Sequence, residues 1–336
     1  MANNMTSDEV HRPCDTDFPT FTGTLFILIF IISVIGNSLL LCVLFIYEGL
    51  KSITNIFILN LVCSDLIFTI TLPFWAVDHL HQWVFGDFVC KFMTAAFFVG
   101  LYSSVILLTA MTVARFIRVV LPNWKSNRAR RKKYAIGACI AAWIISISAS
   151  LSDAMKVKVE HWYGKNYCHD ESEDKLGHYL QVSLLFFLPF AIIIFCYSAI
   201  LKTVLQGLNR KKSRTVAVLL CIVAVFFICW GPYHIMLLIK ALNTNKDCKV
   251  LKRLEVAYHI CEMLAYSHCC MNPLLYMISQ KLRKHLLNLL KCKNLCSKNK
   301  EEDSGQKTSG IQNVAFTVEN YSVNTERHSD PFNSPS

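Results

Sequence analysis

The chain has 336 residues, of which 54% are hydrophobic and only 17% charged, and its mean hydropathy is +0.39. Soluble proteins carry about 25% charged residues, so this composition excludes an ordinary soluble fold. Few Gly and Pro exclude collagenous and disordered chains, and the length excludes a small disulfide scaffold despite the 15 Cys. The composition indicates a polytopic membrane protein.

Seven apolar blocks follow one another along the chain, each long enough for a helix that crosses a bilayer core of about 30 Å. They cover residues 21–47, 54–79, 88–120, 134–154, 177–205, 215–242 and 254–278. The connections are short, so no soluble domain fits between the spans. The sequence therefore predicts an all-α protein: an N-terminal tail over 1–20, a seven-transmembrane helix bundle over 21–280, an amphipathic eighth helix over 281–296, and a disordered tail over 297–336.

The distribution of charge predicts how the bundle is oriented. Most of the 34 Lys and Arg lie in the first, third and fifth connections and in the C-terminal tail, whereas most Asp and Glu lie on the other side. The positive-inside rule then places the N-terminus outside and the C-terminus in the cytoplasm. We expect a multi-pass protein of the plasma membrane. Its net charge of +11 describes a cytoplasmic rim that suits anionic membrane lipid and gives no reason to expect nucleic acid.

Three of the polar residues inside predicted spans need a reason: Asn37, Asp65 and Asn272. A carboxylate at the centre of a membrane costs a few kcal/mol, so Asp65 is a functional candidate by default. One interpretation is a set of hydrogen bonds that ties helices together. The other, which we favour, is a polar cluster that holds water and a sodium ion near Asp65 and rearranges between two states. Helix kinks for such a rearrangement are expected at Pro73, Pro189, Pro232 and Pro273.

Short motifs sit in defined spans: GN at 36–37, LxxxD at 61–65, Trp143 alone in the fourth span, Pro189 with Tyr197 in the fifth, CWGP at 229–232 and NPLLY at 272–276. Each motif is weak alone, but together and in this order they resemble the rhodopsin-like G-protein-coupled receptors over about residues 22–296. TLPFW at 71–75, WVFGDFVCK at 83–91 and SHCCMNP at 267–273 resemble the chemokine receptors. Within that subfamily the run over 52–68 looks most like the lymphotactin (XC) type.

The resemblance implies a set of functional residues. A ligand site at the outer mouth would be lined by Trp75, Asp78, Phe97, Asp153, Tyr233 and Glu262. Phe97 replaces the Asp of an amine receptor, and aromatic walls with a few carboxylates suit the basic N-terminus of a chemokine. The activation switch and G-protein coupling would involve Asn37, Asp65, Arg115, Tyr197, Trp230, Pro232, Asn272, Pro273 and Tyr276. No chemistry on the ligand is expected.

Four cysteines are expected outside, at positions 14, 90, 168 and 248. The outside is oxidising, which predicts two disulfides, but spacing alone leaves three connectivities open. The resemblance implies Cys90–Cys168 and Cys14–Cys248. A metal site is not expected: Cys269 and Cys270, beside His268, lie in a packed helix and lack a fourth ligand.

The two tails carry candidate modification sites. Asn4-Met5-Thr6 is a glycosylation sequon, whereas the first 20 residues lack the Tyr that chemokine receptors commonly sulfate. KLRKHLLNLLK at 281–291 has leucines on one face, which is typical of an interfacial helix, and Cys292 and Cys296 follow where palmitate could anchor it. The polar tail beyond, rich in Ser and Thr, is expected to serve receptor kinases and arrestin.

The third span ends on Ala114-Arg115-Phe116, where the receptor family usually has Asp-Arg-Tyr. Without the carboxylate, Arg115 is held less firmly, which predicts either raised basal signalling or a receptor that has lost coupling and scavenges its ligand. Because Arg115, Tyr197 and Tyr276 are kept, we favour signalling, through a G protein of the inhibitory class by analogy with the family.

Two other classes of protein fit the sequence less well. A transporter or channel would need charged residues along a continuous path, and the spans offer chiefly Asp65 and Glu262. An enzyme is not expected, because the chain has no Walker loop, no GxSxG and no HExxH motif, and no soluble domain to carry them.

Overall fold

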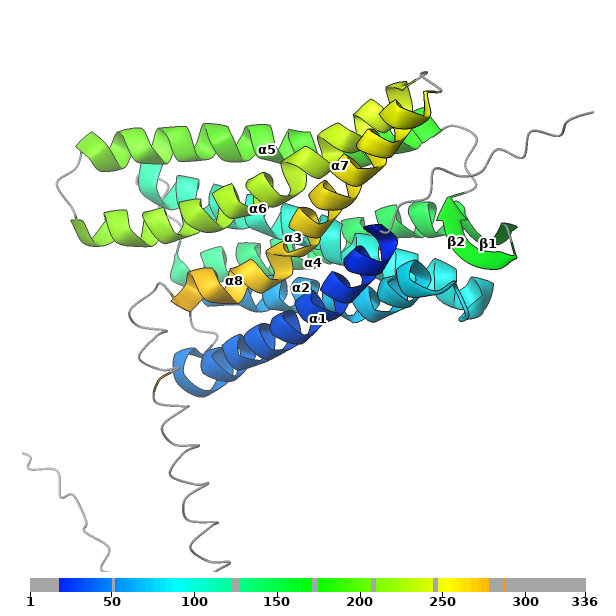
Figure 1. Cartoon of the computed structure of the whole chain (residues 1–336). Helices are drawn as coiled ribbons and strands as arrows, with labels where there is room; N and C mark the ends of the chain where they lie inside the picture. The colour runs from blue at the N-terminus through cyan, green and yellow to red at the C-terminus, as the bar shows by residue number, and fades with distance from the viewer. Residues whose placement is uncertain are drawn as a thin grey trace, which may run out of the picture. The chain divides into compact units, whose positions relative to one another are not determined.

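The computed structural model describes residues 18–49, 52–121, 127–162, 164–170, 175–206, 210–243, 247–277 and residue 287. These residues form a helical bundle and one antiparallel hairpin (Figure 1). The elements are α1 (Phe18–Val43), a π-helical turn η1 (Leu44–Glu48), α2 (Ile53–Leu80), α3 (Gly86–Val120), α4 (Arg128–Met155), β1 (Val157–Trp162), β2 (Lys165–Asp170), α5 (Lys175–Gln206), α6 (Arg210–Leu242), α7 (Cys248–Tyr266) and α8 (His268–Met277).

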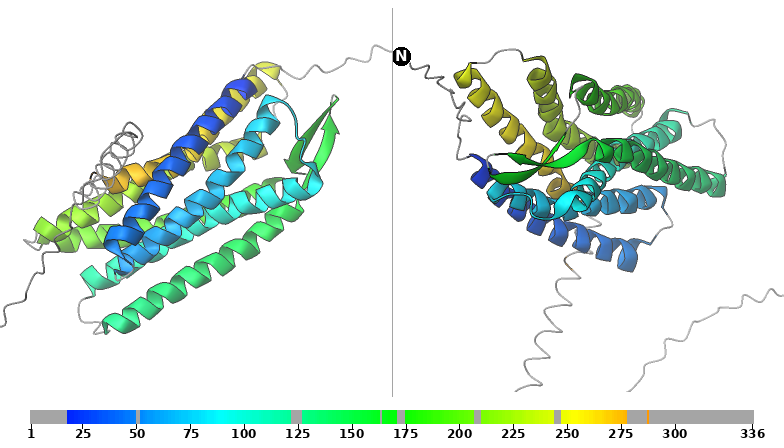
Figure 2. Two further views of the ribbon diagram at one scale, coloured as in Figure 1. Left: turned by 90° about the horizontal axis from the view of Figure 1, so that it is seen from below. Right: turned by 90° about the vertical axis from the view of Figure 1, so that its right-hand side faces the viewer.

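The helices pack as a ring that includes α3, and α4 packs against α3 and α2. Helix α1 contacts α2, α2 contacts α3, α3 contacts both α4 and α5, and α5 contacts α6. Helices α7 and α8 contact α6 on one side and α1 on the other, which closes the ring. Figure 2 shows the hairpin lying across one end of this bundle, which we call the hairpin end; the opposite end, where α3 finishes, is the Arg115 end.

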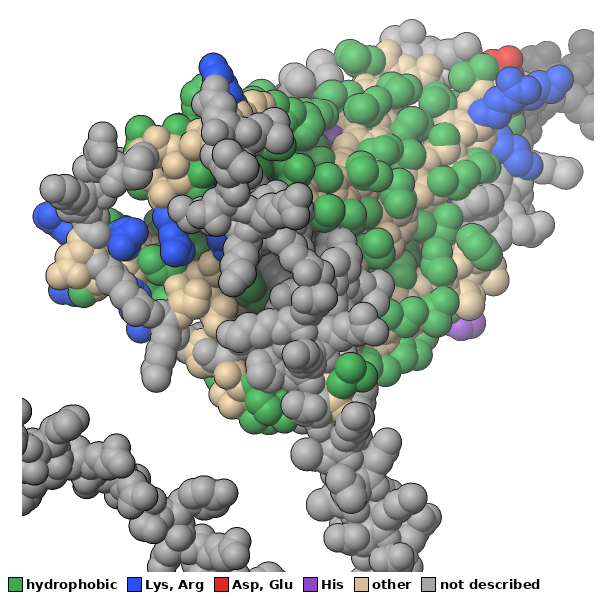
Figure 3. All heavy atoms as spheres, turned by 90° about the vertical axis from the view of Figure 1, so that its left-hand side faces the viewer, with side chains coloured by type: hydrophobic (Ala, Val, Ile, Leu, Met, Phe, Trp, Pro, Cys, Tyr) green, Lys and Arg blue, Asp and Glu red, His purple; other side chains and the backbone are tan. Residues whose placement is uncertain are grey.

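Six described helices, α1 to α6, contain stretches long and apolar enough to cross a membrane, which confirms the first six predicted spans. Their outward faces carry large apolar side chains, as a lipid-facing surface requires. Figure 3 shows hydrophobic side chains covering much of the described surface. Examples that stand exposed are Ile35, Ile140, Ile144, Leu188 and Phe195.

The seventh predicted span is divided into α7 and α8 by a turn at Ser267, where one continuous helix was expected. Three successive side chains account for the interruption, because each bonds to the carbonyl three residues earlier. Ser267 Oγ donates to Leu264 at 2.7 Å, His268 Nδ1 lies 2.9 Å from the Ala265 carbonyl, and Cys269 Sγ donates to Tyr266 at 3.1 Å. Such local bonds compete with the helical ladder.

The label α8 thus denotes the second half of the seventh span. The amphipathic eighth helix predicted over 281–296 lies outside the described residues, apart from Leu287, which is helical and exposed. The segments 1–17 and 288–336, with Asn4, Cys14, Cys292 and Cys296, also lie outside the described part of the chain.

Glycine permits the closest approach between α2 and α3. A Cβ added at Gly100 would lie 2.7 Å from Phe68 Cβ and 2.9 Å from its backbone nitrogen. Backbone atoms cannot move aside as a flexible side chain could. Gly137, on the exposed side of α4, has nothing within 4 Å of the same added atom.

We therefore expect Gly100→Ala to destabilise the protein by about 1–3 kcal/mol through overpacking. Gly137→Ala is the matched control and should stabilise it by about 0.5–1 kcal/mol, because alanine loses less entropy in a helix. Thermal unfolding of purified protein in detergent measures both changes. Equal melting temperatures for the two variants would contradict this packing.

Candidate functional site

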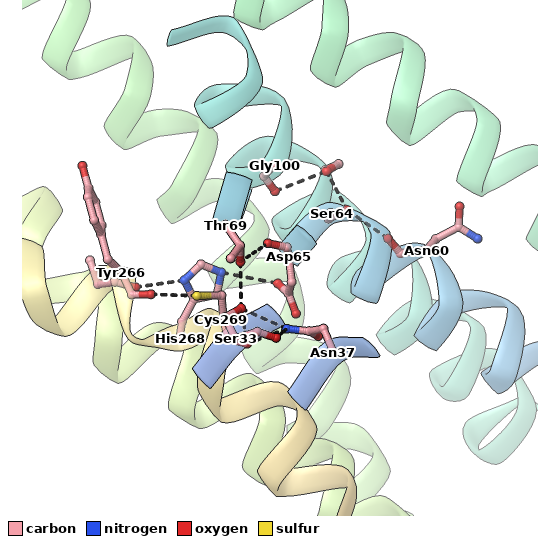
Figure 4. A network of polar contacts seen from close by, with 12 residues as sticks. Ser33, Asn37, Asn60, Ser64, Asp65, Thr69, Gly100, Tyr266, His268 and Cys269 are labelled. Carbon is pink, nitrogen blue, oxygen red and sulfur yellow. Dashed lines mark hydrogen bonds and ion pairs between the residues drawn. The ribbon is translucent and has the colours of Figure 1, made fainter. Parts of the chain in front are cut away.

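A buried polar core lies where α1, α2 and α8 meet (Figure 4). We define it as Ser33, Asn37, Asp65, Thr69, His268 and Cys269, all of them buried. The Asn37 amide nitrogen donates to the Cys269 carbonyl and to the Ser33 carbonyl, each at 3.0 Å. The Ser33 and Thr69 hydroxyls share a hydrogen bond of 2.7 Å. Polar contacts therefore join three helices inside an apolar bundle.

Pro273 explains why the Cys269 carbonyl takes a partner from another helix. Proline has no backbone N–H, so the carbonyl four residues before it loses its helical donor. Asn37 supplies the missing donor from α1. Gly36 allows the two helices to approach, since a Cβ there would lie 3.1 Å from Pro273 Cγ. The GN and NP pairs of the sequence thus meet in one contact.

Asp65 faces His268 at the centre of the polar core. Its Oδ1 lies 3.6 Å from His268 Nε2, and the two side chains are 0% and 2% exposed. The Ala265 carbonyl can only accept, so His268 Nδ1 carries a hydrogen, and in a neutral ring Nε2 would turn its lone pair toward the carboxylate. A buried carboxylate next to a nitrogen lone pair is unfavourable in an apolar interior. The pair therefore requires one positive charge between the two groups.

Asp65 and His268 alone fit the predicted sodium ion poorly. Sodium is a hard cation that prefers oxygen ligands, whereas Asp65 Oδ1 meets an imidazole nitrogen of His268 at 3.6 Å. A proton on His268 Nε2 would supply the required positive charge.

Cys269 and Cys270 serve the packing of α8. The Cys269 thiol donates to the Tyr266 carbonyl at 3.1 Å, and the Cys270 thiol donates to Ile29 of α1 at 3.3 Å. In the part of the chain that the structure describes, no group of three or more His, Cys, Asp or Glu could hold a metal ion.

A second polar chain joins α2 to α3 and α4. Ser103 donates to the Ser64 hydroxyl at 2.7 Å, and Ser64 donates to the Asn60 carbonyl at 3.0 Å. Trp143 Nε1 donates to Asn60 Oδ1 at 2.9 Å. The tryptophan that stands out in the fourth span therefore connects α4 to α2.

The hairpin is fixed to the start of α3. Cys90 and Cys168 form a disulfide with a Cα–Cα distance of 5.7 Å, which is the pairing that the resemblance implied. The Trp83 N–H donates to the Asn166 carbonyl at 2.7 Å, and the Val159 N–H donates to Asp87 at 3.2 Å. Cys248 is also disulfide-bonded, while Cys14, its predicted partner, lies outside the described residues.

Glu262 is a buried carboxylate on the side of α7 that faces α2 and α6. It is 6% exposed, its Oε2 lies 3.1 Å from His259 Nδ1, and its Oε1 accepts from the Tyr266 hydroxyl at 3.3 Å. The His259 ring packs edge-on against His79 of α2, with centroids 5.7 Å apart. The carboxylate is therefore oriented by groups at helical spacings of three and four residues.

An aromatic cluster connects Glu262 with the polar core, and we define it as Phe68, Trp75, Phe97, Trp230, Tyr233 and Tyr266. Trp230 lies at its centre, with ring centroids 6.2 Å from Tyr266, 5.7 Å from Tyr233 and 6.5 Å from Phe97. The same indole lies 5.2 Å from the His268 ring. Ring contacts thus run from Tyr266, which bonds Glu262, to the residue that faces Asp65.

The cluster contains three of the six predicted ligand residues, Trp75, Phe97 and Tyr233, and touches a fourth, Glu262. Asp78 lies one turn beyond Trp75 on α2 and is half-buried. Asp153 occupies a different place: it is buried between α3 and α4, accepts a 2.6 Å hydrogen bond from the Tyr102 hydroxyl, and lies 3.6 Å from Lys156 Nζ.

The Arg115 end carries the predicted coupling residues. Arg115 Nη2 donates to Thr54 Oγ1 of α2 at 2.9 Å. Tyr197 is buried in α5. Asn272 and Tyr276 belong to α8, but their side chains lie outside what the structure describes. The described exposed cations at this end include Arg118, Arg130, Arg131, Lys132 and Lys133.

Comparison with known proteins identifies this arrangement. The family model for the 7 transmembrane receptor (rhodopsin family) matches residues 36–276. The chain is 38% identical over 288 residues to Chemokine XC receptor 1 of Homo sapiens, covering 83% of this chain and 85% of that protein. The chain belongs to the chemokine receptors of the rhodopsin family.

Other relatives agree with this assignment. Chemokine XC receptor 1 of Mus musculus is 39% identical over 279 residues, which cover 82% of this chain and 85% of that protein. C-C chemokine receptor type 4 of Homo sapiens is 33% identical over 304 residues, which cover 86% of this chain and 84% of the relative. The protein is a multi-pass membrane receptor, as its composition indicated.

Sequence reasoning missed three residues that this chemokine receptor brings to the site: His259, Tyr266 and Thr54. The first two could have been found from their spacing, because residues three and four positions from Glu262 share its helix face. No local signal indicated Thr54, since it meets Arg115 only through the packing of α2 on α3.

We expect Asn37→Leu to destabilise the receptor by about 1–3 kcal/mol, because the buried Cys269 carbonyl would keep only the longer, 3.4 Å bond from the Ser33 hydroxyl. Ser38→Leu is the matched control, as it introduces the same side chain at an exposed neighbouring position. Thermal unfolding in detergent measures both. A loss confined to Ser38→Leu would contradict the role of Asn37.

Proposed function

We propose that this receptor resides in the plasma membrane with its hairpin end outside, binds a small basic chemokine of the lymphotactin type, and activates a heterotrimeric G protein of the inhibitory class. The observation that carries the proposal is the position of Glu262. It is a buried carboxylate joined through Tyr266 to the aromatic cluster and so to the polar core. Similarity to Chemokine XC receptor 1 supports the choice of ligand.

A cationic ligand group would be attracted to Glu262 for a direct reason. In the structure the carboxylate has a neutral hydroxyl on one oxygen and an imidazole on the other. A ligand amine or guanidinium that replaced His259 at Oε2 would form a charge-assisted hydrogen bond in a poorly hydrated place, which is stronger than a neutral one. The basic N-terminal segment of a chemokine offers such groups.

Ligand binding would then act on Trp230 through adjoining rings. Movement of Tyr266 or Tyr233 changes the packing of Trp230, which lies two residues before Pro232 inside α6. The missing backbone hydrogen bond at Pro232 makes this a place where α6 can bend. The Arg115 end of α6 would swing, and coupling between two such sites is typically about 1–3 kcal/mol.

At the Arg115 end, exposed cations and Arg115 itself suit a G protein that inserts an acidic or carbonyl-rich helix end. The serine- and threonine-rich tail remains the predicted site of receptor kinases and arrestin. Asn4 as a glycosylation site, and Cys292 and Cys296 as palmitoylation sites, also remain predictions.

Ala114 supports a second candidate, an atypical receptor that captures and internalises chemokine without nucleotide exchange. Exchange on a purified inhibitory G protein, measured with a chemokine panel that includes lymphotactin, separates the two functions. We expect stimulated exchange with one chemokine, and in cells a loss of response after the inhibitory α subunit is inactivated. Uptake of chemokine with no exchange would establish the scavenger instead.

We expect Glu262→Gln to raise the chemokine concentration for half-maximal response about tenfold or more, because Gln keeps the hydrogen bonds but loses the charge. Asp247→Asn is the control: it removes a negative charge from the start of α7, and Asn serves equally well as the helix cap that Asp247 provides. Receptors are compared at matched surface levels. Equal potency in wild type and Glu262→Gln would refute pairing at Glu262.

A further inference from the structure

Arg115 is held by a neutral acceptor on a neighbouring helix. Its Nη2 donates to Thr54 Oγ1 at 2.9 Å, and Thr54 is the second residue of α2. The residue before Arg115 is Ala114, so its own helix offers no acidic side chain at that position. Arg115 is half-buried, which means that water screens its charge only in part.

The carboxylate side chains that the structure describes lie away from Arg115, while η1 ends on Glu48, next to the start of α2, and the side chain of Glu48 lies outside what is described. One, in the polar core, lies mid-membrane, and the others lie toward the hairpin end. The described acidic side chains are Asp65, Asp78, Asp87, Asp153, Glu160, Asp247, Glu255 and Glu262. By contrast, Arg118 stands exposed one turn further along α3, and α4 begins at this end with Arg130, Arg131, Lys132 and Lys133 exposed. The described charged side chains at this end are therefore positive.

The position of Thr54 adds to that positive charge. The first turn of a helix carries the positive end of the macrodipole, so a guanidinium bound there is repelled by the helix that holds it. The Thr54 hydroxyl is held in position because the start of α2 is fixed by two hydrogen bonds. The Asn55 amide donates to the Gly49 carbonyl at 3.0 Å, and the Ile56 N–H donates to the Ser52 carbonyl at 3.2 Å, which fixes the start of α2.

We propose that Thr54 is the positioning residue that holds Arg115 against α2 and sets the basal activity of this receptor. The Thr54 hydroxyl holds the guanidinium against α2, although the positive charge of the helix end and of the neighbouring cations favours its release. A hydrogen bond to a neutral hydroxyl is weaker than one to a carboxylate, so the resting state is only moderately favoured. Release leaves Arg115 able to meet a G protein. This inference rests on the proposed G-protein activation.

The test compares basal nucleotide exchange in three threonine variants at matched surface levels. Thr54→Val keeps the shape and removes the hydroxyl, and we expect basal exchange to rise about tenfold or more, the range that one hydrogen bond from a charged group allows. Thr54→Ser keeps the hydroxyl and should stay close to wild type. Thr109→Val is the matched control, since the Thr109 hydroxyl bonds only within α3, to the Val105 carbonyl.

A double-mutant cycle shows whether Thr54 acts through Arg115. Ala114→Asp places a carboxylate beside Arg115, and we expect it to lower basal exchange and to suppress most of the rise caused by Thr54→Val. An equal rise in both backgrounds would mean that Thr54 acts elsewhere, and would overturn the inference.

Ligand-stimulated exchange, recorded in the same assay, separates this inference from the proposed function. Stimulated exchange in wild type with unchanged basal exchange in Thr54→Val overturns the role of Thr54 alone. No exchange in any variant overturns G-protein activation and the inference together. A rise in Thr54→Val that Thr54→Ser and Thr109→Val do not share supports both.

Discussion

The bond between Asn37 and the Cys269 carbonyl is the contact on which the arrangement of the bundle depends. Pro273 removes the donor that this carbonyl would have in a continuous helix, and a carbonyl left unpaired in a membrane interior is costly. Asn37 supplies the donor only because Gly36 lets α1 approach Pro273. The ring of helices is therefore closed by a polar contact between α1 and α8, which the missing backbone donor at Pro273 makes necessary. The polar core forms around this contact.

The polar core and the aromatic cluster place two buried carboxylates within one set of contacts. Glu262 bonds Tyr266, Tyr266 packs near Trp230, and Trp230 packs near His268, which faces Asp65. Each carboxylate has an imidazole as a neighbour, His259 or His268, whose charge depends on a proton. These contacts link the hairpin end to mid-membrane without a continuous path of charged residues. A two-state receptor needs such a link, whereas a channel would need the charged path.

The two ends of the bundle differ in how their charged side chains are paired. Toward the hairpin end, carboxylates are paired: Asp87 with Lys91 at 2.7 Å, Asp153 with Tyr102 and Lys156, and Glu262 with His259. At the Arg115 end, described cations outnumber described acids, and the half-buried Arg115 contacts α2 through the Thr54 hydroxyl. With Ala114 beside it in α3, Arg115 thus takes a partner from another helix.

The sequence by itself determined the number and order of the spans, the membrane class and the receptor family. Span length is a local property of about 20 apolar residues, and the motifs lie within single spans. Only the tertiary structure decided which residues meet: Asn37 with Cys269, Asp65 with His268, and Arg115 with Thr54. It also decided the break at Ser267 and the separation of Asp153 from the aromatic cluster. These contacts join helices far apart in the chain, and their pairing depends on the rotation and depth of each helix, which packing sets and local pattern does not.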